Sequence, residues 1–98
     1  MTIDQYKNDT EMRIALTGRL DTISSPELEA IISNELDGVI DLTLDLKGLD
    51  YISSAGLRVL LRAQKKMAAV GTMKLIGVSP MIMEIFEITG FSEILTIE

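Results

Sequence analysis

Two adjacent serines, Ser53 and Ser54, stand where the residue pattern changes from that of a strand to that of a helix. Upstream, Leu42, Leu44 and Leu46 alternate with polar residues, which is the period of a strand with one buried face. Downstream, the residues that we expect to face inward recur at helical spacing. The predicted inward positions are Leu57, Leu60, Leu61, Gln64, Met67 and Ala68, and the basic residues off this stripe are Arg58, Arg62, Lys65 and Lys66. The pattern therefore predicts two hydroxyl groups at a helix N-terminus.

A serine at the start of a helix can serve in two ways. The first turn of a helix leaves backbone N–H groups unpaired and carries about half a positive charge. A hydroxyl there can cap the helix, which stabilises it by about 0.5–2 kcal/mol. A phosphate on the hydroxyl would be accepted by the same N–H groups. The local pattern leaves both a capping role and a phosphoacceptor role open for Ser53 and Ser54.

The composition argues against most other chemistry. The 98 residues include no cysteine and no histidine, which removes disulfides, thiolate nucleophiles, Ser-His and Cys-His dyads and the usual zinc ligands. We therefore expect no catalytic residues, no metal site and no cofactor. Nine Lys and Arg against fifteen Asp and Glu give a net charge of −6, so nucleic-acid phosphates would repel the chain. Nucleic acid is not an expected direct partner.

The N-terminal segment does not have the pattern of a targeting signal. It contains Asp4, Lys7, Asp9 and Glu11, so it lacks the uninterrupted apolar core of a signal peptide. No apolar run in the chain approaches the ~18 to 20 residues of a membrane span. We expect a cytoplasmic protein without membrane insertion.

Further strands and helices must position the two serines. The expected strands cover 3–6, 11–17, 42–46, 73–78 and 94–97, with 7–10 as a hairpin turn and 18–21 as a loop that leaves the sheet. The expected helices lie between these strands and end near Gly38, Gly71 and Gly90, and Ser79-Pro80 is the expected start of the last one. The order ββαβαβαβ indicates an α/β domain over residues 1–98. It predicts a mixed sheet with right-handed crossovers, helices mainly on one face, and strand 73–78 in the interior of the sheet.

Two start signals overlap at the first helix. Ser24 with Glu27 forms a capping box, whereas Ser25 with Pro26 forms a cap followed by proline at the first helical position. We favour Ser25 as the cap. The expected buried stripe of this helix consists of Leu28, Ile31, Ile32 and Leu36. Its acidic residues form either a solvated face or a carboxylate pair for acid–base work, and no serine, lysine or histidine at suggestive spacing supports the pair.

The segment from Asp45 to Leu61 carries a more specific signal. Its sequence, Asp-Leu-Lys-Gly-Leu-Asp-Tyr-Ile-Ser-Ser-Ala-Gly-Leu-Arg-Val-Leu-Leu, resembles the signature of the STAS domain, the family of bacterial anti-sigma factor antagonists. Residues 16–21 and 88–91 resemble family segments near its start and end, so the resemblance spans nearly the whole chain. In the family the phosphorylated serine lies two residues before the motif glycine, which implies phosphorylation of Ser54. Ser53 stands where well-known members often have aspartate.

The resemblance and the local pattern together suggest a partner-binding set. Its members are Asp21, Ser53, Ser54, Gly56 and Arg58. The alternative for Asp21 is a cap on the following turn, and the alternative for Arg58 and Arg62 is a solvated helix face. Met81 and Met83 are either exposed, adaptable contacts or core residues.

The resemblance implies a phosphorylation-switched binding module and no enzyme. The unphosphorylated chain would sequester an anti-sigma factor that is also a serine kinase, and phosphorylation of Ser54 would release it. A serine phosphatase would reset the switch. The family also allows a constitutive scaffold or adaptor in a signalling assembly or a lipid-transport complex. A small hydrolase with Ser54 as nucleophile is the third hypothesis, and it lacks a base within any recognised motif.

Overall fold

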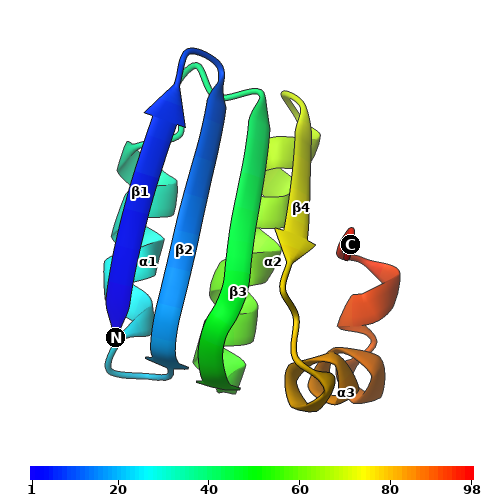
Figure 1. The fold of residues 1–98 in the computed structure, drawn as a ribbon. Helices are drawn as coiled ribbons and strands as arrows, with labels where there is room; N and C mark the ends of the chain where they lie inside the picture. The colour runs from blue at the N-terminus through cyan, green and yellow to red at the C-terminus, as the bar shows by residue number, and fades with distance from the viewer.

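The computed structural model describes residues 1–98, whose four strands form one mixed sheet in the order β1-β2-β3-β4 (Figure 1). Strand β1 runs antiparallel to β2, whereas β2, β3 and β4 are parallel. The strands are β1 (Thr2–Asn8), β2 (Glu11–Leu20), β3 (Asp41–Ile52) and β4 (Thr72–Ile76). The helices are α1 (Ser25–Asn34), α2 (Ser54–Ala68) and α3 (Pro80–Thr89), followed by the 3-10 turn η1 (Phe91–Glu93). The expected α/β domain with a mixed sheet is confirmed.

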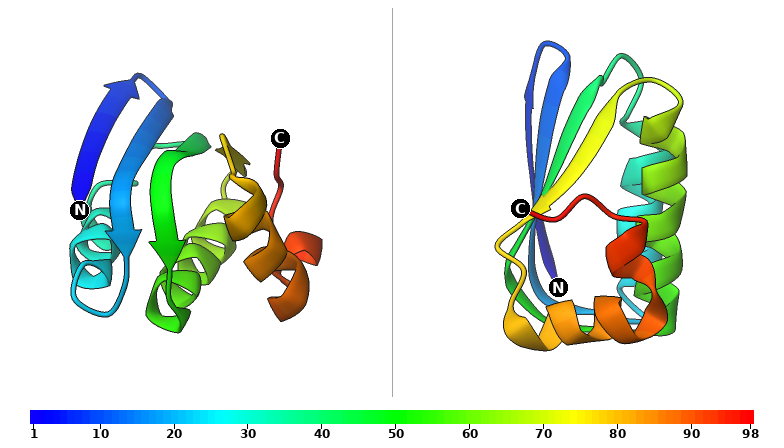
Figure 2. Two further views of the ribbon diagram at one scale, coloured as in Figure 1. Left: turned by 60° about the horizontal axis from the view of Figure 1, so that its bottom comes forward. Right: turned by 90° about the vertical axis from the view of Figure 1, so that its right-hand side faces the viewer.

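The helices α1 and α2 cover one face of the sheet and leave the other face uncovered, while α3 lies across one end (Figures 1 and 2). The core of 23 buried apolar residues therefore forms between the sheet and the helix layer. Ile14 and Leu16 of β2 and Leu44 and Leu46 of β3 are at most 1% exposed. None of the helices combines the length and the apolar composition that crossing a bilayer requires. The expectation of helices mainly on one face is also confirmed.

Strand β2 continues through residues that were expected to form a loop. Gly18, Arg19 and Leu20 pair with residues of β3, which itself runs on to Ile52. The register shifts between Ala15 and Thr17, and again between Gly18 and Arg19. These irregularities break the alternation of apolar and polar residues, so the sequence pattern does not predict that the strand continues. The longer β2 and β3 bring their ends together at the start of α2.

The expected interior place of the strand at 73–78 was wrong, because β4 lies at the edge of the sheet. The expected last strand, 94–97, is reduced to a single parallel bridge between Leu75 and Ile97. Leu75 N–H donates to the Thr96 carbonyl, and Glu98 N–H donates to the Leu75 carbonyl, both at 2.9 Å. Turn η1 occupies the residues just before this bridge, so the pairing with β4 does not begin earlier in the chain.

The helix ends agree in part with the sequence analysis. Helix α1 has Ser24 as its N-cap, so the preference for Ser25 was wrong; Ser25 is the first helical residue and is buried. This helix ends at Asn34, before the expected Gly38. In α3 the predicted signals are confirmed: the Ser79 hydroxyl accepts from Ile82 N–H at 3.3 Å, and Gly90 closes the helix with a φ of 82°.

The buried face of α2 is rotated from the predicted stripe. Leu57, Leu60 and Met67 are buried as expected, but Leu61 and Gln64 are only half-buried and Ala68 is exposed. Gly56, Val59 and Ala63 complete the buried face instead. Glycine and alanine have no bulk to signal burial in a hydropathy pattern, yet they allow the helix to lie close to the sheet.

Candidate functional site

Ser53 is the N-cap of α2, and the fold uses both of its oxygens. The residue has extended backbone angles, with φ of −96° and ψ of 175°. Its hydroxyl oxygen accepts from Gly56 N–H at 3.4 Å, and its carbonyl accepts from Leu57 N–H at 2.9 Å. Its own N–H donates to the Leu20 carbonyl at 2.9 Å, which ties the start of α2 to the end of β2. Of the two serines, Ser53 therefore has the capping role.

Ser54 is the first residue of α2 and is exposed. The hydroxyl of the preceding serine already satisfies the capping function, so the Ser54 hydroxyl is not required to hold the helix start. It projects from the turn in which the positive end of the helix dipole lies. The arrangement leaves the Ser54 hydroxyl open to a reagent from solvent.

Gly56 lies beneath this exposed turn and is buried. A Cβ atom at this position would stand 2.9 Å from the Leu20 carbonyl oxygen and 2.9 Å from Cγ1 of Ile52. Because one of these neighbours is backbone, a larger residue would force α2 away from the ends of β2 and β3. Gly56, expected among the partner-binding residues, thus supports the first turn of α2 from below.

Asp21 organises the connection between β2 and α1. Its Oδ1 accepts from the N–H groups of Ile23 and Ser24 at 3.1 and 3.0 Å. The Asp21 N–H donates to the Ser24 hydroxyl, which lies 2.6 Å from the Arg19 carbonyl oxygen. The pKa of Asp21 is lowered chiefly by the Ser24 N–H, despite partial desolvation, with the Ser24 hydroxyl, the Ile23 N–H and the Arg19 charge adding to the effect. Of the two alternatives for Asp21, the structure shows the turn-capping one.

Arg19 and Tyr51 form a contact that the sequence analysis missed. They are paired neighbours on β2 and β3, and the Arg19 guanidinium carbon lies 4.2 Å from the centroid of the Tyr51 ring. The Arg19 side chain also lies 3.8 Å from Asp21. No local signal could have revealed this stack, because it depends on β2 continuing past the expected loop.

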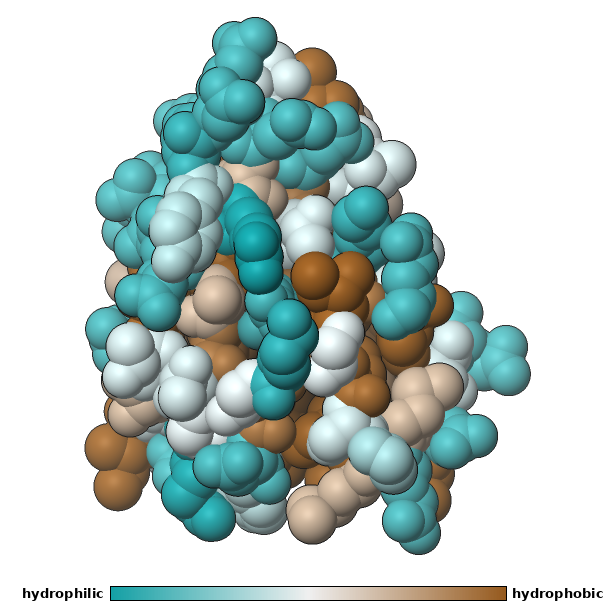
Figure 3. All heavy atoms as spheres, in the orientation of Figure 1, coloured by the Kyte–Doolittle hydropathy of each residue, from teal (hydrophilic) through white to brown (hydrophobic).

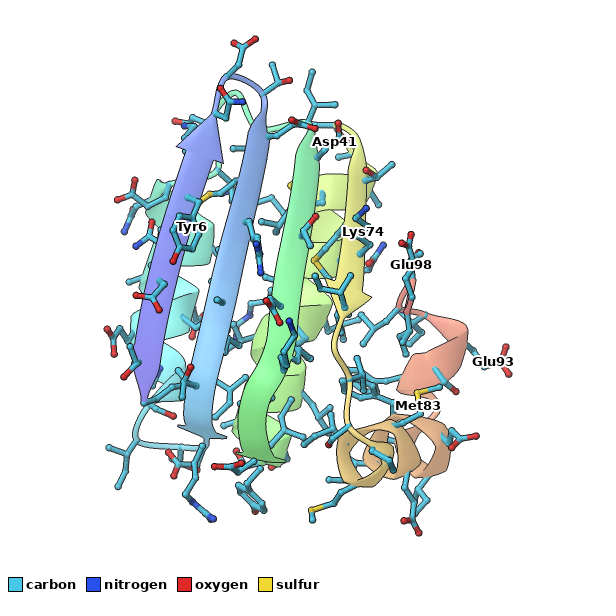
Figure 4. All side chains as sticks on the ribbon, in the orientation of Figure 1. Tyr6, Asp41, Lys74, Met83, Glu93 and Glu98 are labelled. Atoms are coloured by element: carbon cyan, nitrogen blue, oxygen red, sulfur yellow. The ribbon has the colours of Figure 1, made fainter.

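Three chain segments lie along the end of the sheet where α2 begins: the β2–α1 connection, the start of α2 and the start of α3 (Figure 2). Exposed apolar side chains stand in two of them, Ile23 at 90% and Met81 at 61% exposure. Met83 is half-buried and packs against the core, and Figure 4 places it on α3. Of the two alternatives considered for the methionines, Met81 is thus exposed and Met83 is a core contact.

The basic residues of α2 differ in their surroundings. Arg62 forms an ion pair with Glu29, and the Lys66 ammonium donates to the Ile32 and Ser33 carbonyls, so both tie α2 to α1. Arg58 is exposed and has no ion-pair partner in the chain. Of the arginines expected near the site, only Arg58 is free to meet an external group.

A large hollow lies elsewhere on the molecule. It has a volume of about 880 Å³, and Figure 4 shows three of its lining residues, Tyr6, Asp41 and Lys74, on the upper half of the sheet and a fourth, Glu98, on the C-terminal segment beside β4. Figure 3 shows the uncovered sheet face as largely hydrophilic, with apolar surface toward β4 and α3. Neither Ser53 nor Ser54 lines this hollow, and no three carboxylates gather in the structure to hold a metal ion. The candidate site is an exposed turn rather than a cavity.

The chain is similar over nearly its whole length to proteins named as anti-sigma factor antagonists. It is 38% identical over 96 residues to BtrV of Bordetella bronchiseptica, a candidate anti-sigma factor antagonist, and the match covers 96% of this chain and 83% of that protein. It is 28% identical over 98 residues to the anti-sigma-B factor antagonist of Bacillus subtilis, covering 99% of this chain and 90% of the relative.

The fold is also that of SpoIIAA, a Bacillus anti-sigma factor antagonist with structures in two forms. The unphosphorylated form matches with a TM-score of 0.79 at 20% identity, covering 99% of this chain and 87% of that one. The phosphorylated form matches with a TM-score of 0.78 at 21% identity, covering 99% and 91%. At such identities the likeness concerns the fold alone. The STAS domain family itself matches residues 2–98, and the chain therefore belongs to the STAS domain family.

Proposed function

We propose that this chain is a cytoplasmic anti-sigma factor antagonist that is switched by phosphorylation of Ser54. In its unphosphorylated state it binds an anti-sigma factor that is also a serine kinase, and the sigma factor is freed. The names of the similar proteins support the antagonist role, which is a binding role and not an enzymatic one.

The observation that carries the proposal is the different environment of two adjacent hydroxyl groups. The Ser53 hydroxyl is half-buried and holds the Gly56 N–H, whereas Ser54 is exposed on the first turn of α2. A kinase needs a hydroxyl that projects from the surface of its substrate and can reach the γ-phosphoryl group of ATP. Ser54 meets this requirement without loss of the helix cap.

In the phosphorylation step, the Ser54 oxygen forms a bond to the γ-phosphorus of ATP. The bond from that phosphorus to the oxygen bridging to the β-phosphate breaks, and ADP leaves. The hydroxyl proton passes to a base on the kinase. The product carries about −1.5 to −2 charges at neutral pH, beside the positive end of the helix dipole.

The added charge acts on the interface and spares the fold. At the surface of the free chain it is solvated and favoured by the helix N-terminus. Pressed against a partner that offers no spare cation, the same charge loses water without compensation. Phosphorylation thus releases the anti-sigma factor, and a serine phosphatase restores the binding form.

The proposed contact surface surrounds Ser54. Ser53, the N-cap of α2, precedes it, Arg58 follows it on α2, and Asp21 stands in the β2–α1 connection at the same end of the sheet. Gly56 acts indirectly, because it is buried and sets how closely α2 approaches the sheet. The Asp21 carboxylate accepts hydrogen bonds from two backbone N–H groups of the β2–α1 connection and so keeps this connection in one conformation. This lowers the entropy that the connection loses when a partner binds.

The test is incubation of the chain with its cognate anti-sigma kinase and ATP, followed by mass spectrometry of the phosphopeptides. We expect one phosphate, on Ser54, and none on the Ser54→Ala variant, while Ser53→Ala is still modified. A phosphate on Ser53 would show that Ser53, and not Ser54, is the phosphorylated residue. Stable binding of the kinase without modification of either serine would favour a constitutive scaffold or adaptor.

A further inference from the structure

Helix α2 has an unusual charge distribution for a chain with a net charge of −6. It contains Arg58, Arg62, Lys65 and Lys66 and no acidic residue. Arg62 and Lys66 are engaged with α1 through Glu29 and two carbonyl groups. Arg13, Arg19 and Arg62 each have a carboxylate partner, so Arg58 is the one arginine of the chain without an ion pair. Its guanidinium is a binding group that the unmodified fold leaves unused.

Arg58 stands four residues after Ser54, on the same exposed side of the helix. Residues at this spacing are neighbours, with about 5–6 Å between their Cβ atoms. Helical side chains lean toward the helix N-terminus, which directs Arg58 toward Ser54. An acidic group followed four residues later by a basic one is also the more favourable order for a pair within a helix. Phosphorylation of Ser54 would create such a pair.

We propose that Arg58 binds the phosphate of phosphorylated Ser54 within the same helix. This inference rests on the proposed phosphorylation of Ser54 and adds an internal receptor for the new charge. A guanidinium can donate two hydrogen bonds to phosphate oxygens at once, which suits it for this contact.

The contact gives the switch a second component. In the unphosphorylated chain Arg58 is free to pair with an acidic group of the anti-sigma factor. After phosphorylation the same guanidinium is occupied by the phosphate, so the interface gains a negative charge and loses a positive one. A single modification therefore changes two neighbouring positions of the binding surface.

The test uses chains with phosphoserine inserted at position 54 during translation, so that no kinase is needed. Arg58→Gln removes the proposed receptor. Lys65→Gln is the matched control, because Lys65 is also exposed and unpaired on α2 but lies about three turns from Ser54. Melting temperatures of the phosphorylated and unphosphorylated forms are measured for the parent chain and both variants, together with phosphorus NMR titration of the phosphate.

We expect phosphorylation to raise the melting temperature by about 1–4 °C more in the parent chain and in Lys65→Gln than in Arg58→Gln. The second pKa of the phosphate should be higher in Arg58→Gln than in the other two, and 1 M salt should reduce both differences. Equal behaviour of Arg58→Gln and Lys65→Gln would overturn the inference. Because the phosphate is inserted directly, failure of a kinase to modify Ser54 would overturn the proposed function and leave this measurement intact.

Discussion

The hydroxyl oxygen of Ser53 lies 3.4 Å from the backbone nitrogen of Gly56 and accepts its hydrogen. Through this contact Ser53, which precedes the proposed phosphoacceptor Ser54, holds the helix start, and Gly56 beneath it lets the helix lie against β2 and β3. Ser54 lies between these two residues and neither caps the helix nor packs it against the sheet. The site is therefore one exposed hydroxyl between two residues that hold the start of α2 in place.

The separate roles of the two serines can be measured in the isolated chain. Ser53→Ala removes the cap and should lower the free energy of unfolding by about 0.5–2 kcal/mol. Ser54→Ala, at an exposed position outside the cap, should change it by less than about 0.5 kcal/mol. Urea denaturation of both variants checks this. Equal losses in the two variants would mean that the capping contact is shared.

A charge at position 54 should separate binding from stability. Ser54→Asp places a carboxylate at the positive end of α2, so its melting temperature should equal or exceed that of the parent chain. The same charge at a desolvated contact should weaken binding to the anti-sigma factor by about 2–5 kcal/mol, measured by calorimetry. An early-melting variant would show that the substitution damages the fold, and parent-like binding would remove Ser54 from the interface.

The packing of α2 on the sheet predicts a large loss from one substitution. Leu57 is 8% exposed, and Leu57→Asp would bury a carboxylate without a partner, at a cost of several kcal/mol. This is comparable to the stability of a small domain, so we expect the variant to be largely unfolded in circular dichroism. Ile23→Asp is the matched control, because Ile23 is 90% exposed and should tolerate the same change. A cooperative, parent-like melt of Leu57→Asp would contradict the placement of this face.

The ion pair between Arg13 and Asp45 predicts a specific acid sensitivity. Asp45 is 6% exposed, and the Arg13 side chain 2.5 Å away, helped by the Lys47 N–H, lowers the pKa of the Asp45 carboxyl. A carboxyl whose pKa is lower in the folded state stabilises the fold fully above its unfolded pKa, and this contribution is lost as the pH falls through the folded pKa. The parent chain should therefore lose stability below about pH 4.

Asp45→Asn should be less stable than the parent at pH 7 and should show a shallower loss in acid, as measured by urea denaturation from pH 7 down to pH 2.5. Asp50→Asn is the control, because Asp50 is exposed and forms no ion pair. A parent-like acid slope in Asp45→Asn would show that other carboxyl groups dominate acid unfolding.

The sequence by itself determined the order of elements from β1 to α3 and the position of the candidate site. Alternating leucines before Ser53 and helical spacing after it were sufficient to place the serines at a helix start, because these periods reflect burial on one face of a strand or helix. The Ser79-Pro80 start and the Gly90 end of α3 were also readable, since capping and positive φ depend on local chemistry.

Only the tertiary structure decided which serine caps α2, because the pattern leaves two adjacent hydroxyls equivalent until the backbone direction is fixed. It also decided the stack of Arg19 on Tyr51, which requires β2 and β3 to pair beyond the point where alternation ends. The sequence also could not show which basic residues of α2 are engaged, or that Arg58 has no ion-pair partner. Arg62 contacts Glu29 and Lys66 contacts carbonyl groups of α1, and these contacts form only because α1 and α2 pack on the same face of the sheet.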